Sequence, residues 1–288
     1  MVMKRGLFLL LLFVILCNLF IPYTYIRLAY HYPKSGMPSN LYLYNDETFI
    51  FHYYTLTDKE KKVYNEYLQA LLHLDKKILL AEKLTIDQER KVFEAISHDH
   101  PDIFYLPQRK CRYSLFTKKI SFCEFDYPYT KEEIEYLAPL LNERIDAIVK
   151  EASKLANDYE KVKYVHDVII DMAEYDYVNY NSNNTFKEFT DYQSVVSILL
   201  TGKSVCSGYS KLFQIIMNRL NIKATTFYDN EYIKEGETGH IWNAVYVNDN
   251  WYYVDVTWDD NNYDKYMYFL NTYDEFYQTH TVIDEKLV

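Results

Sequence analysis

The segment from Gly239 to Trp258 constrains the fold more than any other, because its pattern is typical of a β-hairpin. Two runs of apolar and aromatic residues flank a short polar turn. We expect the turn at the pair Asn248-Asp249. In that register His240 and Asp255 become diagonal neighbours on one face of the ribbon, with backbones about 7–8 Å apart and within side-chain reach. A three-residue turn would place Asp255 on the opposite face, so the pairing depends on the register.

Asp255 is expected in the middle of the second strand, between Val254 and Val256. Strand propensity disfavours Asp there, and a polar residue where local rules favour an apolar one indicates a site. In this position Asp255 can accept a hydrogen bond from one ring nitrogen of His240 and leave the other nitrogen to take a proton. The alternative is a histidine at a sheet edge and a turn or surface carboxylate.

A cysteine upstream completes a possible set. Cys206 lies in the stretch Gly202–Ser210, just before a run with a helical apolar face that ends near Asn221. At the first turn of a buried helix, free backbone N–H groups and the helix dipole favour a thiolate and can stabilise an oxyanion. A lone Cys there is more often an inert buried thiol. With His240 and Asp255 it forms the set of nucleophile, base and orienter.

Three aromatic residues, Trp242, Tyr209 and Trp258, are expected to shield this site from water. A zinc site is a poorer interpretation of Cys206, His240 and Asp255, because the sequence has no CxxC or HxxxH pair and no obvious fourth ligand. The prediction is therefore no metal and no cofactor. His98 and His100 flank the end of an expected helix, where they would serve as caps or core contacts.

At these residues the sequence resembles the transglutaminase-like superfamily, in particular its bacterial secreted or membrane-anchored members. The resemblance is carried, in the family's order of Cys, His and Asp, by Gly202–Ser210, Gly239–Asn243 and Trp251–Asp260. Asp99–Tyr105 and Tyr159–Asp167 resemble upstream segments of the family, so the likeness extends over about residues 57–272. Ser207 and Ser210 depart from the common pattern, where an acidic or amide residue and an Ala are frequent, but neither change removes a catalytic group.

The resemblance implies an α+β, papain-like fold in which the Cys lies on a buried helix packed against an antiparallel sheet that bears the His and the Asp. It also implies acyl transfer through a thioester, without a cofactor. Family members include cross-linkers, peptidases, amidases and copies that have lost the nucleophile. Gln193 is a candidate side-chain donor to the oxyanion, as a glutamine is in papain-like proteases; the alternative is a surface residue at a helix start.

The N-terminus indicates export. Lys4 and Arg5 precede an apolar run from Leu7 to Ile21, so residues 1–30 are expected to be a signal anchor or signal peptide, with the rest of the chain outside the cytoplasm. Bulky residues before Cys17 argue against a lipoprotein signal. Residues 31–56 are expected to be a tether.

The middle of the chain is expected to hold two units, residues 57–128 and the catalytic domain 129–288. Capping patterns predict helices after Thr57 and Thr130. A helix is also expected after Thr85, where Asp87 and Gln88 lie in the first turn. A further helix is expected over Tyr159–Ala173, and a hairpin over residues 111–126. Cys111 and Cys123 lie on opposite arms of that hairpin, either as a disulfide or as two buried thiols.

Composition excludes little else. The chain has 288 residues, enough to bury a hydrophobic core without disulfides or a bound metal. Its net charge of -10 argues against nucleic acid as a partner. The 32 Tyr residues fit either a sticky surface for glycans or peptides or a simple compositional bias.

The predicted function is an extracytoplasmic cysteine enzyme that hydrolyses or transfers an amide bond of a protein, peptide or cell-wall peptide. Hydrolysis is the preferred outcome, because no added substrate-binding domain is evident. The rival is a non-catalytic module that holds a peptide or glycan on the same fold.

Overall fold

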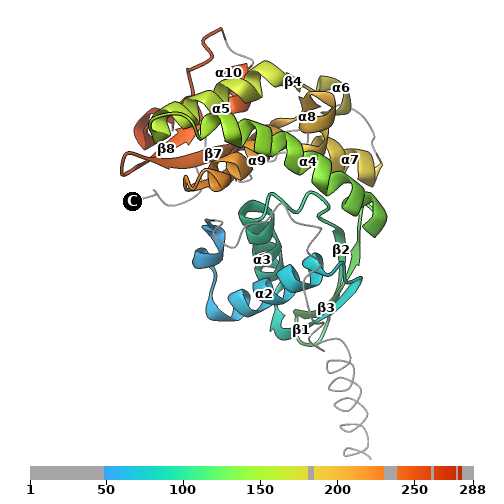
Figure 1. The fold of residues 1–288 in the computed structure, drawn as a ribbon. Helices are drawn as coiled ribbons and strands as arrows, with labels where there is room; N and C mark the ends of the chain where they lie inside the picture. The colour runs from blue at the N-terminus through green and yellow to red at the C-terminus, as the bar shows by residue number, and fades with distance from the viewer. Residues whose placement is uncertain (1–48, 181–184, 230–238, 261–262, 277, 281–288) are drawn as a thin grey trace, which may run out of the picture.

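The computed structural model describes residues 49–180, 185–229, 239–260, 263–276 and 278–280 (Figure 1). Its first part, drawn in blue to green, contains a short helix and two α-helices packed beside a three-stranded antiparallel sheet. These elements are η1 (His52–Thr55), α2 (Asp58–Leu72), β1 (Lys77–Leu84), α3 (Ile86–Asp99), β2 (Gln108–Ser114) and β3 (Lys119–Asp126), with sheet order β1-β3-β2.

The predicted helices of this part are confirmed. Thr57 and Thr85 each form a capping box, with the hydroxyl oxygen accepting from the N–H three residues on and the side chain of that residue accepting from the Thr N–H. The hairpin is confirmed as β2 and β3, whereas strand β1 was not predicted. Cys111 pairs with Cys123 across the hairpin, and their sulfurs form a disulfide.

The second part contains most of the helices and a second antiparallel sheet. Its helices are α4 (Lys131–Ala152), α5 (Asp158–Met172), α6 (Tyr177–Tyr180), α7 (Phe186–Tyr192), α8 (Val195–Thr201), α9 (Cys206–Arg219), α10 (Val256–Asp260) and α11 (Tyr273–Phe276). Its strands are β6 (Ala224–Asp229), β7 (His240–Val247) and β8 (Asn250–Val254) in the order β6-β7-β8, together with the short parallel pair β4 (Glu174–Tyr175) and β5 (Lys203–Ser204).

Helix α9 lies at the centre of this part. It packs against β6 and β7 on one side and against α4, α5 and α8 on the other. A Cβ on Gly208 would lie 1.9 Å from the Ser204 hydroxyl oxygen and 2.9 Å from the Ser194 carbonyl oxygen. The first turn of α9 therefore approaches its neighbours as closely as only glycine permits.

The register predicted for the β7–β8 hairpin is confirmed. Val247 pairs with Asn250, and the turn residues Asn248 and Asp249 have φ values of 50° and 63°, as a tight two-residue turn requires.

The predicted place of Asp255 within a strand is wrong. Strand β8 ends at Val254, and Asp255 precedes the short helix α10. Its carboxylate accepts from the backbone N–H groups of Thr257 and Trp258, both at 3.1 Å. Aspartate is favoured at a helix start, so the residue follows local rules that the strand interpretation had it breaking.

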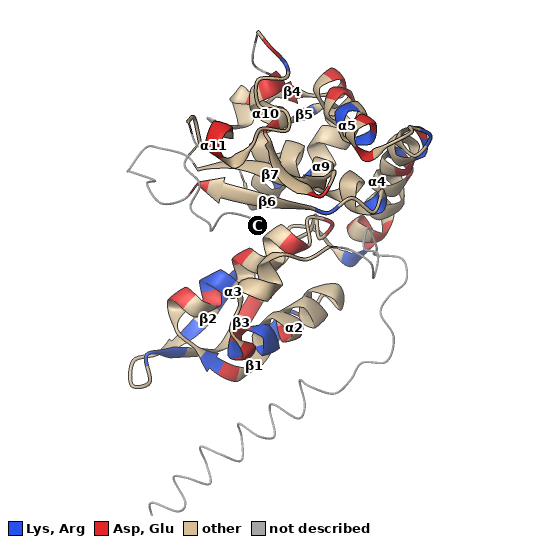
Figure 2. Cartoon of the chain, turned by 90° about the vertical axis from the view of Figure 1, so that its left-hand side faces the viewer, with Lys and Arg blue, Asp and Glu red and all other residues tan. Residues whose placement is uncertain are grey.

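The two parts meet along α3, which contacts β6 (Figure 2). Buried apolar residues of both parts, such as Val63 and Val245, belong to one contiguous cluster. The boundary near residue 128 stays a prediction.

Within the described part of the chain, no helix combines the length and the apolar character needed to span a membrane. The predicted signal anchor, residues 1–30, and most of the predicted tether lie outside the described residues.

Candidate active site

A cleft of about 510 Å³ lies where α3 faces the first turn of α9 and the start of β7. Residues from five elements and their flanking turns line it: Glu94, Ser97, His98, Phe189, Tyr192, Gln193, Val205, Cys206, Ser207, Tyr228, Gly239, His240 and Ile241. Three predicted site residues, Cys206, His240 and Gln193, therefore face one cavity.

Cys206 is the first residue of α9, as predicted, and only 9% of it is exposed. Val205 precedes it as the cap residue and offers no side-chain acceptor to the N–H groups of the first turn. The sulfur thus lies beside backbone donors that no capping side chain occupies, at the end of the helix that favours negative charge.

His240 links the cleft to the buried carboxylate behind it. Its Nε2 lies 2.5 Å from Asp255 Oδ2. Burial disfavours the charged imidazolium, but the charge and hydrogen bond of Asp255, together with the hydrogen bond and charge of the Cys206 sulfur, outweigh burial and raise the pKa of His240 to about 10. The arrangement stabilises a proton on the imidazole at neutral pH.

Asp255 is fully buried, and its two oxygens are saturated. Oδ1 accepts from two backbone N–H groups, and Oδ2 is shared by the Nε2 atoms of His240 and His280 at 2.5 and 3.0 Å. Burial alone would raise the pKa of this carboxyl, but the two histidines lower it to about 2. Asp255 is therefore a fixed negative charge.

His280 was not predicted. It lies 25 residues after Asp255, in a segment with no periodic pattern or motif, so no local signal in the sequence points to it.

Two of the three aromatic residues that were predicted to shield the site, Trp242 and Trp258, lie beside His240, and their shielding role stays a prediction. The Trp258 ring stacks on the His240 ring at 4.9 Å, and Trp242 is buried at 5.9 Å from it. Tyr209 is buried in the main core, where its hydroxyl donates to Asp260 at 2.7 Å. A shielding role for Tyr209 stays a prediction.

Gln193 follows α7 directly and lines the cleft. Its backbone carbonyl accepts from the Ser207 hydroxyl at 3.0 Å and from Lys211 Nζ at 3.1 Å, which ties this turn to α9. Burial lowers the pKa of Lys211 to about 8, although the nearby Cys206 raises it. The position of Lys211 near Cys206 was not predicted, and an oxyanion role for Gln193 stays a prediction.

The first part of the chain contributes the opposite wall through α3. His98 is buried there, with Nδ1 at 2.7 Å from the Thr226 hydroxyl and its ring stacked on Tyr228. Burial lowers its pKa well below the ordinary value, so the ring is neutral. Next to it, Asp99 accepts from the backbone N–H groups of residues 51–53 and from the Tyr64 hydroxyl. His98 is thus a core contact that also lines the cleft.

Among the described residues, His240, Asp255 and His280 place ligand-type atoms within 4.8 Å of one another. Both rings share a carboxylate oxygen that only accepts, so each Nε2 must carry a hydrogen. In this structure the two contacts are those of hydrogen bonds, with two N–H donors on one carboxylate oxygen. In the other such group, Glu89 lies beside two cysteines that are joined in the disulfide.

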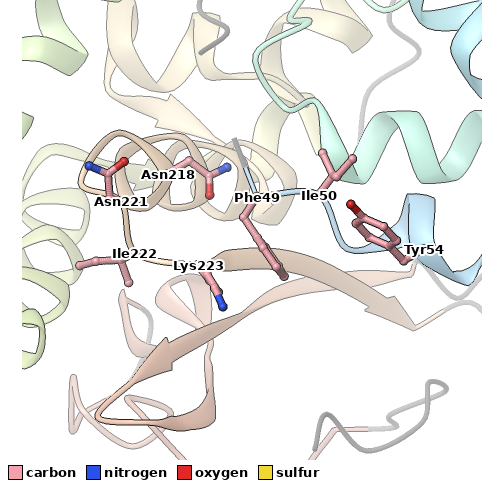
Figure 3. A pocket seen from close by; sticks show the side chains of 7 residues that line it. All are labelled: Phe49, Ile50, Tyr54, Asn218, Asn221, Ile222 and Lys223. Atoms are coloured by element: carbon pink, nitrogen blue, oxygen red, sulfur yellow. The ribbon is translucent and has the colours of Figure 1, made fainter. Parts of the chain in front are cut away.

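A second hollow of about 450 Å³ lies at the opposite end of α9 (Figure 3). It is lined by Phe49, Ile50, Tyr54, Asn218, Asn221, Ile222 and Lys223. A helix of this length places it about 20 Å from Cys206, and it contains none of the predicted site residues.

With this geometry in place, comparison with known proteins identifies the class. Residues 146–256 match the model of the transglutaminase-like superfamily, so this part of the chain is a transglutaminase-like domain. The match includes Cys206, His240 and Asp255 and ends before His280.

Two curated relatives are similar over less than half of the chain. Kyphoscoliosis peptidase of Mus musculus is 30% identical over 151 residues, and that of Homo sapiens is 30% identical over 148 residues. Each match covers 48% of this chain and 21% of the relative, so the chain spans about a fifth of the length of these proteins. A crystal structure of a TGase aligns over 63% of this chain and 50% of its own, with 16% identity and a TM-score of 0.36.

Proposed function

We propose that this chain is a cysteine-dependent acyl-transfer enzyme that cleaves or transfers an amide bond through a thioester on Cys206. One observation carries the proposal: a cleft presents the sulfur of Cys206 beside the His240 imidazole, whose other side is bonded to buried Asp255. This is the relation of nucleophile, base and orienter that covalent acyl transfer needs.

The proposed steps follow from the protonation states. With a proton held on His240, the thiolate of Cys206 attacks the substrate carbonyl and forms the carbon–sulfur bond. Backbone N–H groups at the start of α9 stabilise the oxyanion, with Gln193 as a further donor. His240 then gives its proton to the departing amine as the carbon–nitrogen bond breaks. Water or a second amine, deprotonated by His240, releases the acyl group and restores the thiolate.

The substrate class we propose is a protein, peptide or cell-wall peptide, in keeping with the peptidase name carried by the two relatives. The proposed location is the outer face of a membrane, because the charged and apolar pattern of residues 1–30 is typical of an export signal or membrane anchor. Hydrolysis and transfer differ in whether water or an amine reaches the thioester.

The test is to trap the thioester. We would incubate the protein with fluorescently labelled peptides and wall fragments, quench with acid, and look for a hydroxylamine-sensitive label on the tryptic peptide that contains Cys206. Added dansylcadaverine distinguishes the outcomes, because a transferase attaches it to the acyl group and a hydrolase releases the acid. The matched control is Cys206→Ser.

Labelled peptide that binds reversibly, with no adduct or product that depends on Cys206, would contradict the enzyme. That result would support the non-catalytic module, for which the aromatic wall of the cleft supplies the binding surface.

A further inference from the structure

We propose that His280 is a fourth member of this site: a positioning residue that donates a hydrogen bond to the same Asp255 oxygen that holds His240. This inference rests on the proposed function and extends it to a residue beyond the transglutaminase-like match.

The position of His280 is defined by its surroundings. Its Nε2 lies 3.0 Å from Asp255 Oδ2, and 4% of the residue is exposed. The ring is stacked on Phe276 at 3.8 Å and contacts Trp258 at 4.1 Å and Trp242 at 5.1 Å. Such tight aromatic packing leaves the imidazole one orientation, with a nitrogen on the carboxylate.

The protonation of His280 follows from the chemistry of its partner. Burial lowers its pKa, and the nearby His240 lowers it further, although the Asp255 carboxylate acts in the opposite direction. The ring is therefore neutral and has one N–H group. A carboxylate only accepts, so that hydrogen is on Nε2, and Nδ1 faces the Thr279 hydroxyl at 3.0 Å.

A hydrogen-bond donor on the shared oxygen changes how strongly the Asp255 charge stabilises the His240 imidazolium. Each hydrogen bond that Asp255 accepts disperses its negative charge. Without the bond from His280, more of that charge acts on His240, and the imidazolium gives up its proton less readily. His280 thus keeps His240 able to return to the neutral form, which the release step needs.

Among the described residues, the other ionisable groups around this cluster are Cys206 and Lys211 from α9, His240 from β7, Asp259 from α10, and Tyr268, whose ring lies 5.2 Å from that of His280. Lys211 acts on the sulfur, and Asp259 pairs with His166 at 3.0 Å. His280 is therefore the neutral donor to Asp255 Oδ2, and His240 is the charged one.

The experiment separates formation of the thioester from its release, with p-nitrophenyl acetate as the probe. The thiolate attacks the ester carbonyl and expels p-nitrophenolate as a burst. Water then attacks the thioester, His240 takes the proton, and acetate leaves in the steady state. The burst needs no proton from His240, because p-nitrophenolate leaves as an anion.

The variant His280→Phe keeps a packed ring and removes the donor. We expect a burst of unchanged size, a steady state slowed by roughly tenfold at pH 7, and a pH midpoint of that step raised by about one pH unit, as suits one hydrogen bond to a charged group. His280→Gln, whose amide nitrogen can take the place of Nε2, should have the steady-state rate and the pH midpoint of the unaltered protein. His280→Met, which fills volume without a donor, should behave like His280→Phe.

Each result decides between the two proposals. Absence of a burst that depends on Cys206 in the unaltered protein would remove the proposed function and this inference with it. A normal burst, together with equal release rates and pH midpoints in the Gln and Met variants, would overturn the role of His280 alone, even if His280→Phe does not fold.

Discussion

Replacing Asp255 by Asn tests whether the Asp255 charge stabilises the protonated form of His240. An amide keeps an oxygen for the N–H groups of Thr257 and Trp258, so the cap of α10 survives. Its NH₂ group would then face His240 Nε2, which must become an acceptor. That places the hydrogen on Nδ1, toward Cys206, in the tautomer that cannot take the thiol proton.

The magnitude follows from the charge that is removed. If the pKa of His240 returned from about 10 to its ordinary 6.5, the free energy that favours the imidazolium over the neutral ring would fall by on the order of 5 kcal/mol. Because Cys206 also raises this pKa, we attribute about 3 kcal/mol to Asp255, roughly a hundredfold. We therefore expect alkylation of Cys206 by iodoacetamide at pH 6 to slow roughly a hundredfold in Asp255→Asn.

The assay is the alkylation rate between pH 5 and 9.5, followed by mass spectrometry of the Cys206 peptide. Cys17→Ser serves as the background, since Cys111 and Cys123 are bonded to each other. At pH 9.5, where thiols ionise without assistance, the rates should differ by less than about threefold. Asp260→Asn is the matched control, because Asp260 bonds Tyr209 rather than His240. Equal rates at pH 6 in Asp255→Asn and the parent would refute the reasoning.

Two further predictions concern stability. Gly208→Ala should lower the free energy of unfolding by about 1–3 kcal/mol in guanidinium titrations, because its Cβ would meet the Ser204 hydroxyl at 1.9 Å; an effect no larger than that of the surface change Lys154→Ala would contradict this close approach. Replacing both Cys111 and Cys123 by Ala should cost about 2–3 kcal/mol through the lost chain constraint, and dithiothreitol should then destabilise the parent but leave the double variant unchanged.

Local structure followed closely from the sequence. The capping patterns at Thr57 and Thr130 predicted two helices, because a hydroxyl and a carboxylate three residues apart satisfy N–H groups within one turn. The Asn248-Asp249 turn set the register of β7 and β8, and Cys206 began its helix where expected. These features depend on residues that are neighbours along the chain.

The sequence was less informative where distant segments meet. Strand β1 was missed, and Asp255 was assigned to a strand because its valine neighbours suggested one, whereas its carboxylate starts a helix. Whether Cys111 and Cys123 are bonded stayed open until the hairpin placed them opposite each other.

The sequence by itself determined the helix that begins at Cys206, the ribbon that carries His240, and the order in which the chain supplies them. Only the tertiary structure decided that α3 forms a wall of the cleft and that His280 shares the Asp255 oxygen. The physical reason is that caps, turns and periodicity act over a few residues. A hydrogen bond between residues 25 apart, or a contact between α3 and β6, depends on how the packed core brings those segments together.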